Sequence, residues 1–176
     1  IRDRVNILSK GETIYGVNTG FGMLSQVKID KEDQNKLQIN LIKSHSAGVG
    51  ETMDSGIVRV AMVLKLINYC HGYSGVHPST VDQLVTFMNH DLIPMVPEKG
   101  SVGASGDLAQ LAHIAGALIG EGKLIVNNKI RHSKTILKRL EIKPLKLHQK
   151  DGISLVNGTQ ISTAIAIKAL NSCNIC

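Results

Sequence analysis

Gly100-Ser101-Val102-Gly103-Ala104-Ser105-Gly106-Asp107-Leu108 is the most informative stretch of this chain, and a nearly all-apolar stretch to Gly120 follows it. Its three glycines permit tight and unusual backbone angles. The apolar stretch predicts a helix over residues 107–120, whose first-turn amides would point back at the loop. Such amides favour an anion or a developing negative charge. A plain helix start capped by Asp107 is the alternative, and neither glycine pattern for phosphate binding fits the spacing.

The internal triplet Ala104-Ser105-Gly106 allows a more specific chemistry. In a tightly bent backbone, the amide nitrogen of Gly106 can attack the carbonyl of Ala104. Loss of water from that ring and from the serine side chain leaves an exocyclic methylidene, which is a strong electrophile made from the chain itself. A side chain on Gly106 would obstruct the closure. The pattern alone does not decide between this chemistry and a capped helix start.

Composition indicates a globular chain of about one domain. Hydrophobic residues make up 43% of the 176 residues and charged residues 19%, which excludes a disordered chain. The core must consist of Leu, Ile, Val, Ala and Met, because there is no Trp and only two Phe. The net charge is +6, but the lysines are dispersed and not interleaved with aromatic residues. We therefore expect no nucleic-acid partner.

Three cysteines do not make a disulfide framework, so a reducing, cytoplasmic location is expected. The longest apolar run, Val60 to Cys70, is interrupted by Lys65 and is too short to span a bilayer, so no membrane partner is expected. No metal site is predicted, because the C-x-x-C at Cys173 to Cys176 stands alone and H-E-x-x-H is absent. Both ends of the chain lie within patterned stretches, so residues 1–176 are expected to be part of a longer protein.

Hydrophobic spacing predicts one mainly α-helical unit over residues 1–176. An amphipathic segment at 2–10 precedes a glycine-rich loop at 15–22, and an extended connector is expected at Pro94 to Pro97. A small β-hairpin is expected at 123–131, turning at Asn127-Asn128. One helix is expected to be capped by Asp30, with Leu37, Leu41 and Ile42 at helical spacing, and to be stopped by Gly48 and Gly50. Further helices are expected at 55–70, at 79–90 with Pro78 as the first residue, at 107–120, at 133–140, and at 157–170 as a buried helix.

The chain resembles the aromatic amino acid ammonia-lyase family over essentially its whole length. The block from Gly100 to His113 is similar to the family signature around the Ala-Ser-Gly triplet that becomes the methylidene-imidazolone (MIO) group. Residues 15–22 resemble the loop that carries the catalytic tyrosine, and residues 41–50 resemble the substrate-selectivity helix. Residues 72–75 and 150–160 match two further blocks, and all five occur in the family's order. Gln110 departs from the signature, which usually has proline there.

The resemblance implies that this chain is the helical, MIO-bearing N-terminal portion of an ammonia-lyase. It implies that Ala104, Ser105 and Gly106 form MIO autocatalytically, with Asp107 supporting the cyclisation through a hydrogen bond. It also implies a homotetramer with active sites built from several subunits. Tyr15 is then the catalytic base.

Substrate binding is implied for three further residues. Asn157 is expected to bind beside the MIO ring. Ser44-His45 is similar to the pattern of family members that act on histidine, so Ser44 and His45 are expected to contact an amino acid substrate. The implied reaction converts L-histidine into trans-urocanate and ammonia.

Each assignment has a structural alternative. Tyr15 could be an aromatic plug, His45 a satisfied surface or core histidine, and Asn157 a helix cap. For the protein as a whole, one alternative is a sister ammonia-lyase or aminomutase that acts on tyrosine or phenylalanine. The other is an inactive fragment with a role in assembly.

Overall fold

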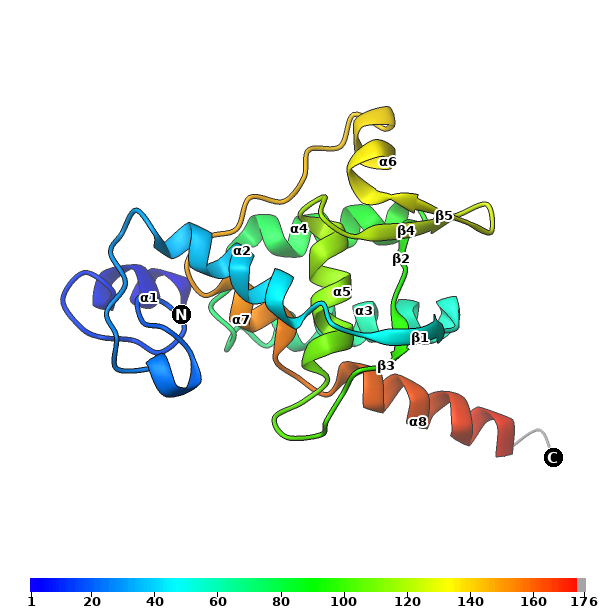
Figure 1. The fold of residues 1–176 in the computed structure, drawn as a ribbon, viewed down its shortest axis with the longest axis horizontal. Coiled ribbons are helices and arrows are strands. Elements are labelled where there is room, and N and C mark those ends of the chain that lie inside the picture. The colour runs from blue at the N-terminus through cyan, green and yellow to red at the C-terminus, as the bar shows by residue number, and fades with distance from the viewer. Residues whose placement is uncertain (174–176) are drawn as a thin grey trace.

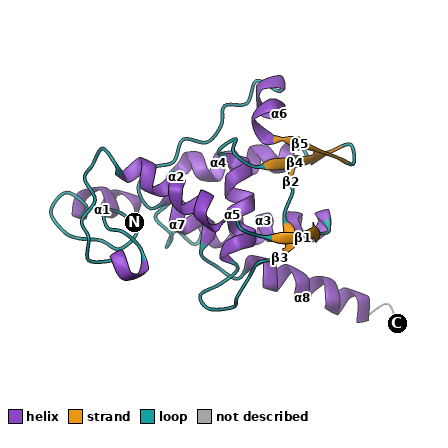
Figure 2. Cartoon of the chain, viewed as in Figure 1, coloured by secondary structure: helices purple, strands orange, loops and turns teal. Residues whose placement is uncertain are grey.

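Helices dominate the computed structural model, which describes residues 1–173 (Figures 1 and 2). The helices are α1 (Arg2–Leu8), α2 (Gln34–His45), α3 (Ser55–Cys70), α4 (Pro78–Asn89), α5 (Leu108–Leu118), α6 (Ser133–Arg139), α7 (Asp151–Val156) and α8 (Gln160–Cys173), with a short 3-10 helix at Gly22–Leu24. The strands are β1 (Val49–Thr52), β2 (Ile93–Pro94), β3 (Pro97–Lys99), β4 (Lys123–Val126) and β5 (Lys129–His132). The prediction of a mainly α-helical fold is confirmed.

The apolar helix α5 runs through the middle of the molecule (Figure 1). It contacts α2, α4, α6, α7 and α8. Most of its residues are buried, including Leu111, Ala112, Ala115 and Leu118. Because it has many alanines, neighbouring helices can pack closely on several sides of it. These helix contacts fix the position of α5. They therefore also fix where the glycine-rich loop joins its first turn.

Two small antiparallel sheets flank the helices on one side (Figure 2). In one, β1 pairs with β3; in the other, the strand order is β2-β4-β5. The hairpin β4–β5 turns at Asn127 and Asn128, whose φ angles are +50° and +58°. Two consecutive residues with positive φ match the twist of the flanking strands. The predicted hairpin is confirmed.

Two helix predictions need correction. The second helix begins at Gln34 and not near Asp30, with Asp33 at its N-cap position. The helix expected at 157–170 begins only at Gln160, because α7 ends at Val156 and Gly158, with φ +149°, separates the two helices.

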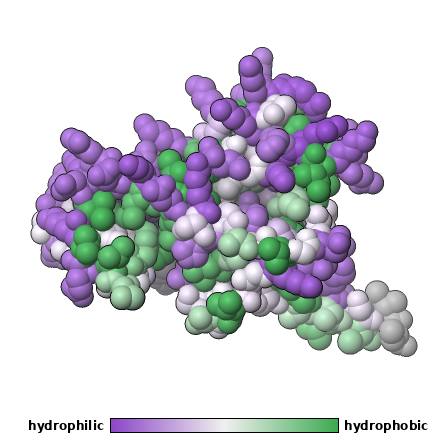
Figure 3. Space-filling model, in the orientation of Figure 1, coloured by the Kyte–Doolittle hydropathy of each residue, from purple (hydrophilic) through white to green (hydrophobic). Residues whose placement is uncertain are grey.

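Helix α8 is also more exposed than expected. Only Ile161 and Ala164 are buried, whereas Ile165 and Leu170 are exposed. Figure 3 shows hydrophobic side chains along this lower edge and hydrophilic ones over α6 and the hairpin. Helix α8 packs on α3 by one face, and the rest of its surface is exposed. Its apolar sequence therefore did not predict how much of the helix is buried within this chain.

No helix within residues 1–173 is long and apolar enough to cross a membrane. Over the same residues, no group of three or more His, Cys, Asp or Glu side chains could hold a metal ion. Cys176 of the C-x-x-C lies outside the described residues.

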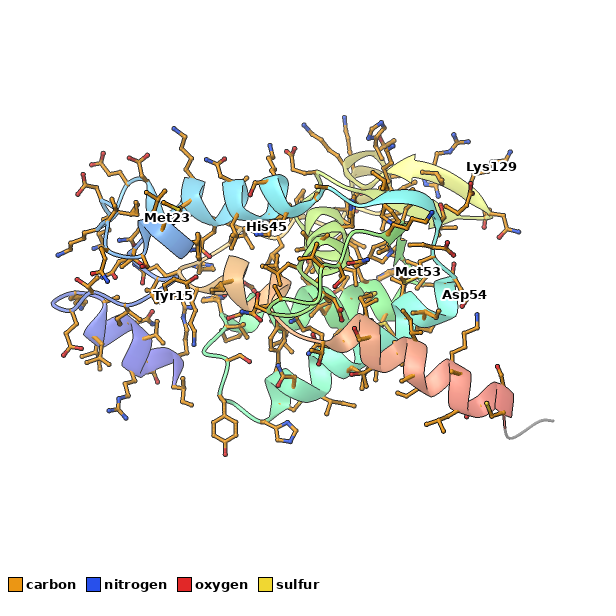
Figure 4. The ribbon with its side chains drawn as sticks, turned by 60° about the horizontal axis from the view of Figure 1, so that its bottom comes forward. Tyr15, Met23, His45, Met53, Asp54 and Lys129 are labelled. Atoms are coloured by element: carbon orange, nitrogen blue, oxygen red, sulfur yellow. The ribbon has the colours of Figure 1, made fainter. Side chains whose placement is uncertain are left out.

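Asp54 fixes the start of α3, at the far end of the molecule from the N-terminal loops (Figure 4). Its carboxylate accepts hydrogen bonds from the backbone N–H groups of Gly56 (2.9 Å) and Ile57 (3.2 Å). It also forms an ion pair with Lys168 of α8 at 3.1 Å. Lys168 and the Ile57 amide lower the pKa of Asp54 below its usual value.

We expect Asp54→Ala to destabilise the first turn of α3 by about 1 kcal/mol, because two amides lose their acceptor. Hydrogen exchange at Gly56 and Ile57 should then accelerate about fivefold. Asp54→Asn, which keeps a good capping oxygen, should change exchange much less. The carboxylate's contribution should be present above the ordinary Asp pKa and be lost as the pH falls through its lowered value. Unchanged exchange in Asp54→Ala would show that the cap is unimportant.

Candidate active site

A pocket of about 320 Å³ lies between the end of α2 and the glycine-rich loop before α5. The two sides are about 60 residues apart in sequence but meet because α2 packs on α5. The pocket brings Ser44 and His45 to the same place as the triplet. It is lined by Ser44, His45, Ala47, Gly100, Ser101, Val102, Ala104, Ser105, Gly106, Leu108 and Ala109.

Close backbone approaches shape the loop. A Cβ on Gly100 would lie 2.9 Å from the Ala109 Cβ and 3.1 Å from the Gly48 Cα. Glycine therefore lets the loop pass tightly between α5 and the end of α2. Gly106 is more constrained still, because its φ is +120° and a Cβ would overlap the carbonyl oxygen of Gly158. Only glycine fits at position 106 in this conformation.

Asp107 occupies the N-cap position of α5, but its side chain does not cap that helix. Its carboxylate instead accepts hydrogen bonds from the backbone N–H (2.8 Å) and the hydroxyl (2.6 Å) of Ser162 in α8. Its own N–H donates to the Gly158 carbonyl at 2.7 Å. The alternative of a plain helix start capped by the Asp107 side chain is therefore wrong. Asp107 joins the triplet to the junction between α7 and α8.

The first-turn amides of α5 are the positive end of its dipole. The first intrahelical bond runs from the Leu111 N–H to the Asp107 carbonyl (3.0 Å), so earlier amides have no partner in the helix. Gln110 is in this turn and donates from its side chain to the Glu98 carbonyl (3.3 Å). Since the backbone N–H at this third helical position has no intrahelical acceptor, the helix start is compatible with glutamine as well as with proline there.

His45 is the last residue of α2 and is partly buried. Its Nδ1 lies 2.9 Å from the Leu41 carbonyl oxygen and 3.2 Å from the Ser44 hydroxyl. A carbonyl oxygen only accepts, so Nδ1 carries the proton and Nε2 of the neutral ring is an acceptor. Nδ1 of His45 thus has hydrogen-bond partners within α2, as expected of a purely structural histidine. The same residue also lines the pocket.

Tyr15 does not line this pocket (Figure 4). Its side chain is 52% exposed, so it is not a buried plug. The ring packs edge-on against Phe21 at 5.9 Å between centroids, and the Gly22 N–H donates to the hydroxyl at 3.4 Å.

Asn157 directly precedes Gly158, whose backbone lies against Gly106. It follows α7 as the C-cap residue and does not cap α8, which begins three residues later. Its side chain is exposed, and its carbonyl accepts a hydrogen bond from Lys65 Nζ at 2.9 Å. Lys65 of α3 therefore holds the backbone at position 157 in place.

Sequence reasoning missed two buried polar residues that hold these loops. Lys65 is only 3% exposed, and burial lowers its pKa to about 8 although the nearby Asp107 carboxylate opposes the shift. Gln38 is fully buried, accepts from the Gly152 N–H (2.8 Å) and donates to the Gly16 carbonyl (3.3 Å). It ties the Tyr15 loop to α7. The position of Lys65 inside an apolar run was a sequence signal for its burial. No such signal marked Gln38.

The contact at Gly106 gives a stability prediction. Gly106→Ala should cost on the order of 3 kcal/mol of unfolding free energy, because an unfavourable φ is combined with overlap against the Gly158 backbone. Gly103→Ala is the matched control, since its φ is +66° but a Cβ there would meet nothing within 4 Å. It should cost only about 1 kcal/mol. Equal losses of stability in urea unfolding would contradict the tight contact.

Comparison with known proteins shows the family of this chain. The family described as aromatic amino acid lyase matches residues 3–176. A histidine ammonia-lyase of Aliivibrio fischeri is 44% identical over 164 residues, which cover 93% of this chain and 32% of that protein. The chain spans about a third of the length of the curated relatives it matches.

Solved structures share the fold. Histidine ammonia-lyase from Trypanosoma cruzi is similar with a TM-score of 0.86 and 36% identity, over 96% of this chain and 33% of that one. Tyrosine aminomutase from Streptomyces globisporus is similar with a TM-score of 0.87 and 36% identity, over 93% of this chain and 31% of that one. With the family match over nearly all residues, these likenesses decide the assignment. This chain belongs to the aromatic amino acid lyase family.

Proposed function

We propose that the whole protein eliminates ammonia from L-histidine and releases trans-urocanate. The observation that carries this proposal is the pocket in which Ser44 and His45 face Ala104-Ser105-Gly106. One side offers hydrogen-bonding groups for an imidazole, and the other offers the triplet from which an electrophile can form. The identity to histidine ammonia-lyases supports the same reaction.

The residues present fit an MIO group at positions 104–106. Gly106 has no room for a side chain and adopts a positive φ, so only glycine fits there, and its amide nitrogen has no side chain beside it to hinder attack on the Ala104 carbonyl. When formed, this group supplies an electrophile that captures the substrate and makes removal of its weakly acidic β-proton feasible. Asp107 supports the closure by fixing the backbone just after Gly106, and the free amides of α5 favour negative charge at the loop.

Tyr15 is the proposed base that removes the β-proton, and Asn157 is proposed to bind beside the triplet. The family resemblance implies a homotetramer whose sites are built from several subunits, so residues of other copies would complete the pocket that this chain forms. Residues 1–176 would then form one MIO-bearing unit of the enzyme, and the odd number of cysteines favours a cytoplasmic location.

A sister activity on tyrosine is the second candidate, because a tyrosine aminomutase is as similar in structure as the histidine enzyme. His45 distinguishes histidine from phenylalanine, because its Nε2 can accept the N–H of a substrate imidazole, a contact that a phenyl ring cannot make. The hydroxyl of a tyrosine can donate to Nε2 as well, so the identity to histidine ammonia-lyases is what favours histidine over tyrosine.

We expect Ser105→Ala in the whole protein to fold normally and to lose turnover of L-histidine to background. Only the serine can be dehydrated to a methylidene, while alanine occupies the same space. Release of urocanate is followed by its absorbance. Ser101→Ala, in the same loop but outside the triplet, should stay within about fivefold of wild type. Wild-type turnover in Ser105→Ala would overturn the MIO assignment.

We expect His45→Leu to lower kcat/KM for L-histidine relative to L-phenylalanine by roughly ten- to a hundred-fold. The substrate imidazole would lose its partner, at about 1–3 kcal/mol, whereas phenylalanine loses none. Ser44→Ala, which removes only the smaller hydroxyl, should change the ratio less. If His45→Leu slows both substrates equally, His45 is a structural residue.

A further inference from the structure

Lys65 is a buried cation to which the reaction assigned above gives no role. It lies in the middle of α3 and is 3% exposed. Its Nζ donates to the Asn157 carbonyl at 2.9 Å and to the Gln160 side-chain oxygen at 3.3 Å. Burying an ammonium group is costly unless its hydrogen bonds are satisfied, so these two acceptors are bound strongly. Lys65 therefore holds both ends of the turn between α7 and α8.

That turn is also the surface against which the triplet is packed. The Gly158 carbonyl, between the two acceptors of Lys65, accepts the Asp107 N–H at 2.7 Å and lies over the Cα of Gly106. Two residues past Gln160, Ser162 donates twice to the Asp107 carboxylate. A continuous set of contacts thus runs from Lys65 through residues 157–162 to Gly106 and Asp107.

The charge of Lys65 also has a partner in this arrangement. The Asp107 carboxylate is close enough to favour the charged form of Lys65 against the effect of burial. Asp107 is itself 3% exposed. Removing the cation would leave the Asn157 carbonyl without its donor and Asp107 without the nearby positive charge. The turn would then be held against Gly106 and Asp107 only by the Gly158 carbonyl and by Ser162, and its two ends would lose their anchor on α3.

We propose that Lys65 is a positioning residue that holds the Asn157–Gln160 turn against Gly106, so that the Ala104-Ser105-Gly106 triplet is kept bent for ring closure and Asn157 is kept beside it. The proposal rests on the proposed function, because it concerns formation of the same electrophile. Lys65 does not line the pocket, so it acts on the triplet through the turn and through its charge near Asp107.

The test uses Lys65→Met in the whole protein, with the ultraviolet absorbance of the cyclised triplet as the readout. We expect cyclisation to fall at least roughly tenfold, the effect of losing a hydrogen bond to a charged group. In the molecules that do cyclise, kcat for L-histidine should fall more than KM rises, because Asn157 is misplaced. Lys65→Arg, which keeps the cation and its donors, should restore part of the absorbance.

Tyr69→Phe is the matched control. It removes another hydrogen bond from α3 to α7, from the Tyr69 hydroxyl to the Ser154 carbonyl (3.0 Å), but not one to the turn. It should lower the thermal midpoint without reducing cyclisation.

Two outcomes would overturn the role of Lys65: wild-type cyclisation and activity in a folded Lys65→Met, or failure of both Lys65 variants to fold while Tyr69→Phe folds. An uncyclised, inactive wild type would instead refute the proposed function itself.

Discussion

The hydrogen bond from the Asp107 N–H to the Gly158 carbonyl is the contact on which the site depends. It joins two segments about 50 residues apart and brings the Gly158 backbone over Gly106, where no side chain fits. The Asp107 carboxylate strengthens the same junction by accepting two hydrogen bonds from Ser162. These contacts fix the end of the triplet, while α5, in the centre of the fold, fixes the residues that follow.

The opposite wall of the pocket depends on a second set of contacts. Helix α2 packs on both α5 and α7, and its last turn carries Ser44 and His45 to the loop. Gln38, two turns earlier on α2, bonds to the start of α7 and to the Tyr15 loop. The pocket-lining residues of α2 and the triplet are thus positioned by the same central helices. This common support explains how a small domain can hold in place a glycine-rich loop that is itself largely exposed.

Patterns that are local in the sequence predicted most of the helices, the hairpin and the glycine-rich loop. The hairpin depends on two adjacent asparagines, and α5 on one apolar stretch, so neighbouring residues carry enough information. What was missed depends on contacts between distant segments. The roles of Lys65 and Gln38, and the side-chain partner of Asp107, are set by residues 22 to 114 positions away. The exposure of α8 could not be predicted either, because an apolar pattern does not say which chain covers it.

Intact mass measurement of the whole protein tests the central claim most directly. Ring closure between Gly106 and Ala104 releases one water, and dehydration of Ser105 releases a second. We predict that the wild-type protein is lighter than its sequence by two waters, that the deficit maps to the peptide containing residues 104–106, and that Ser105→Ala lacks the loss from the serine side chain. A wild-type mass equal to that of the unmodified sequence would contradict the account.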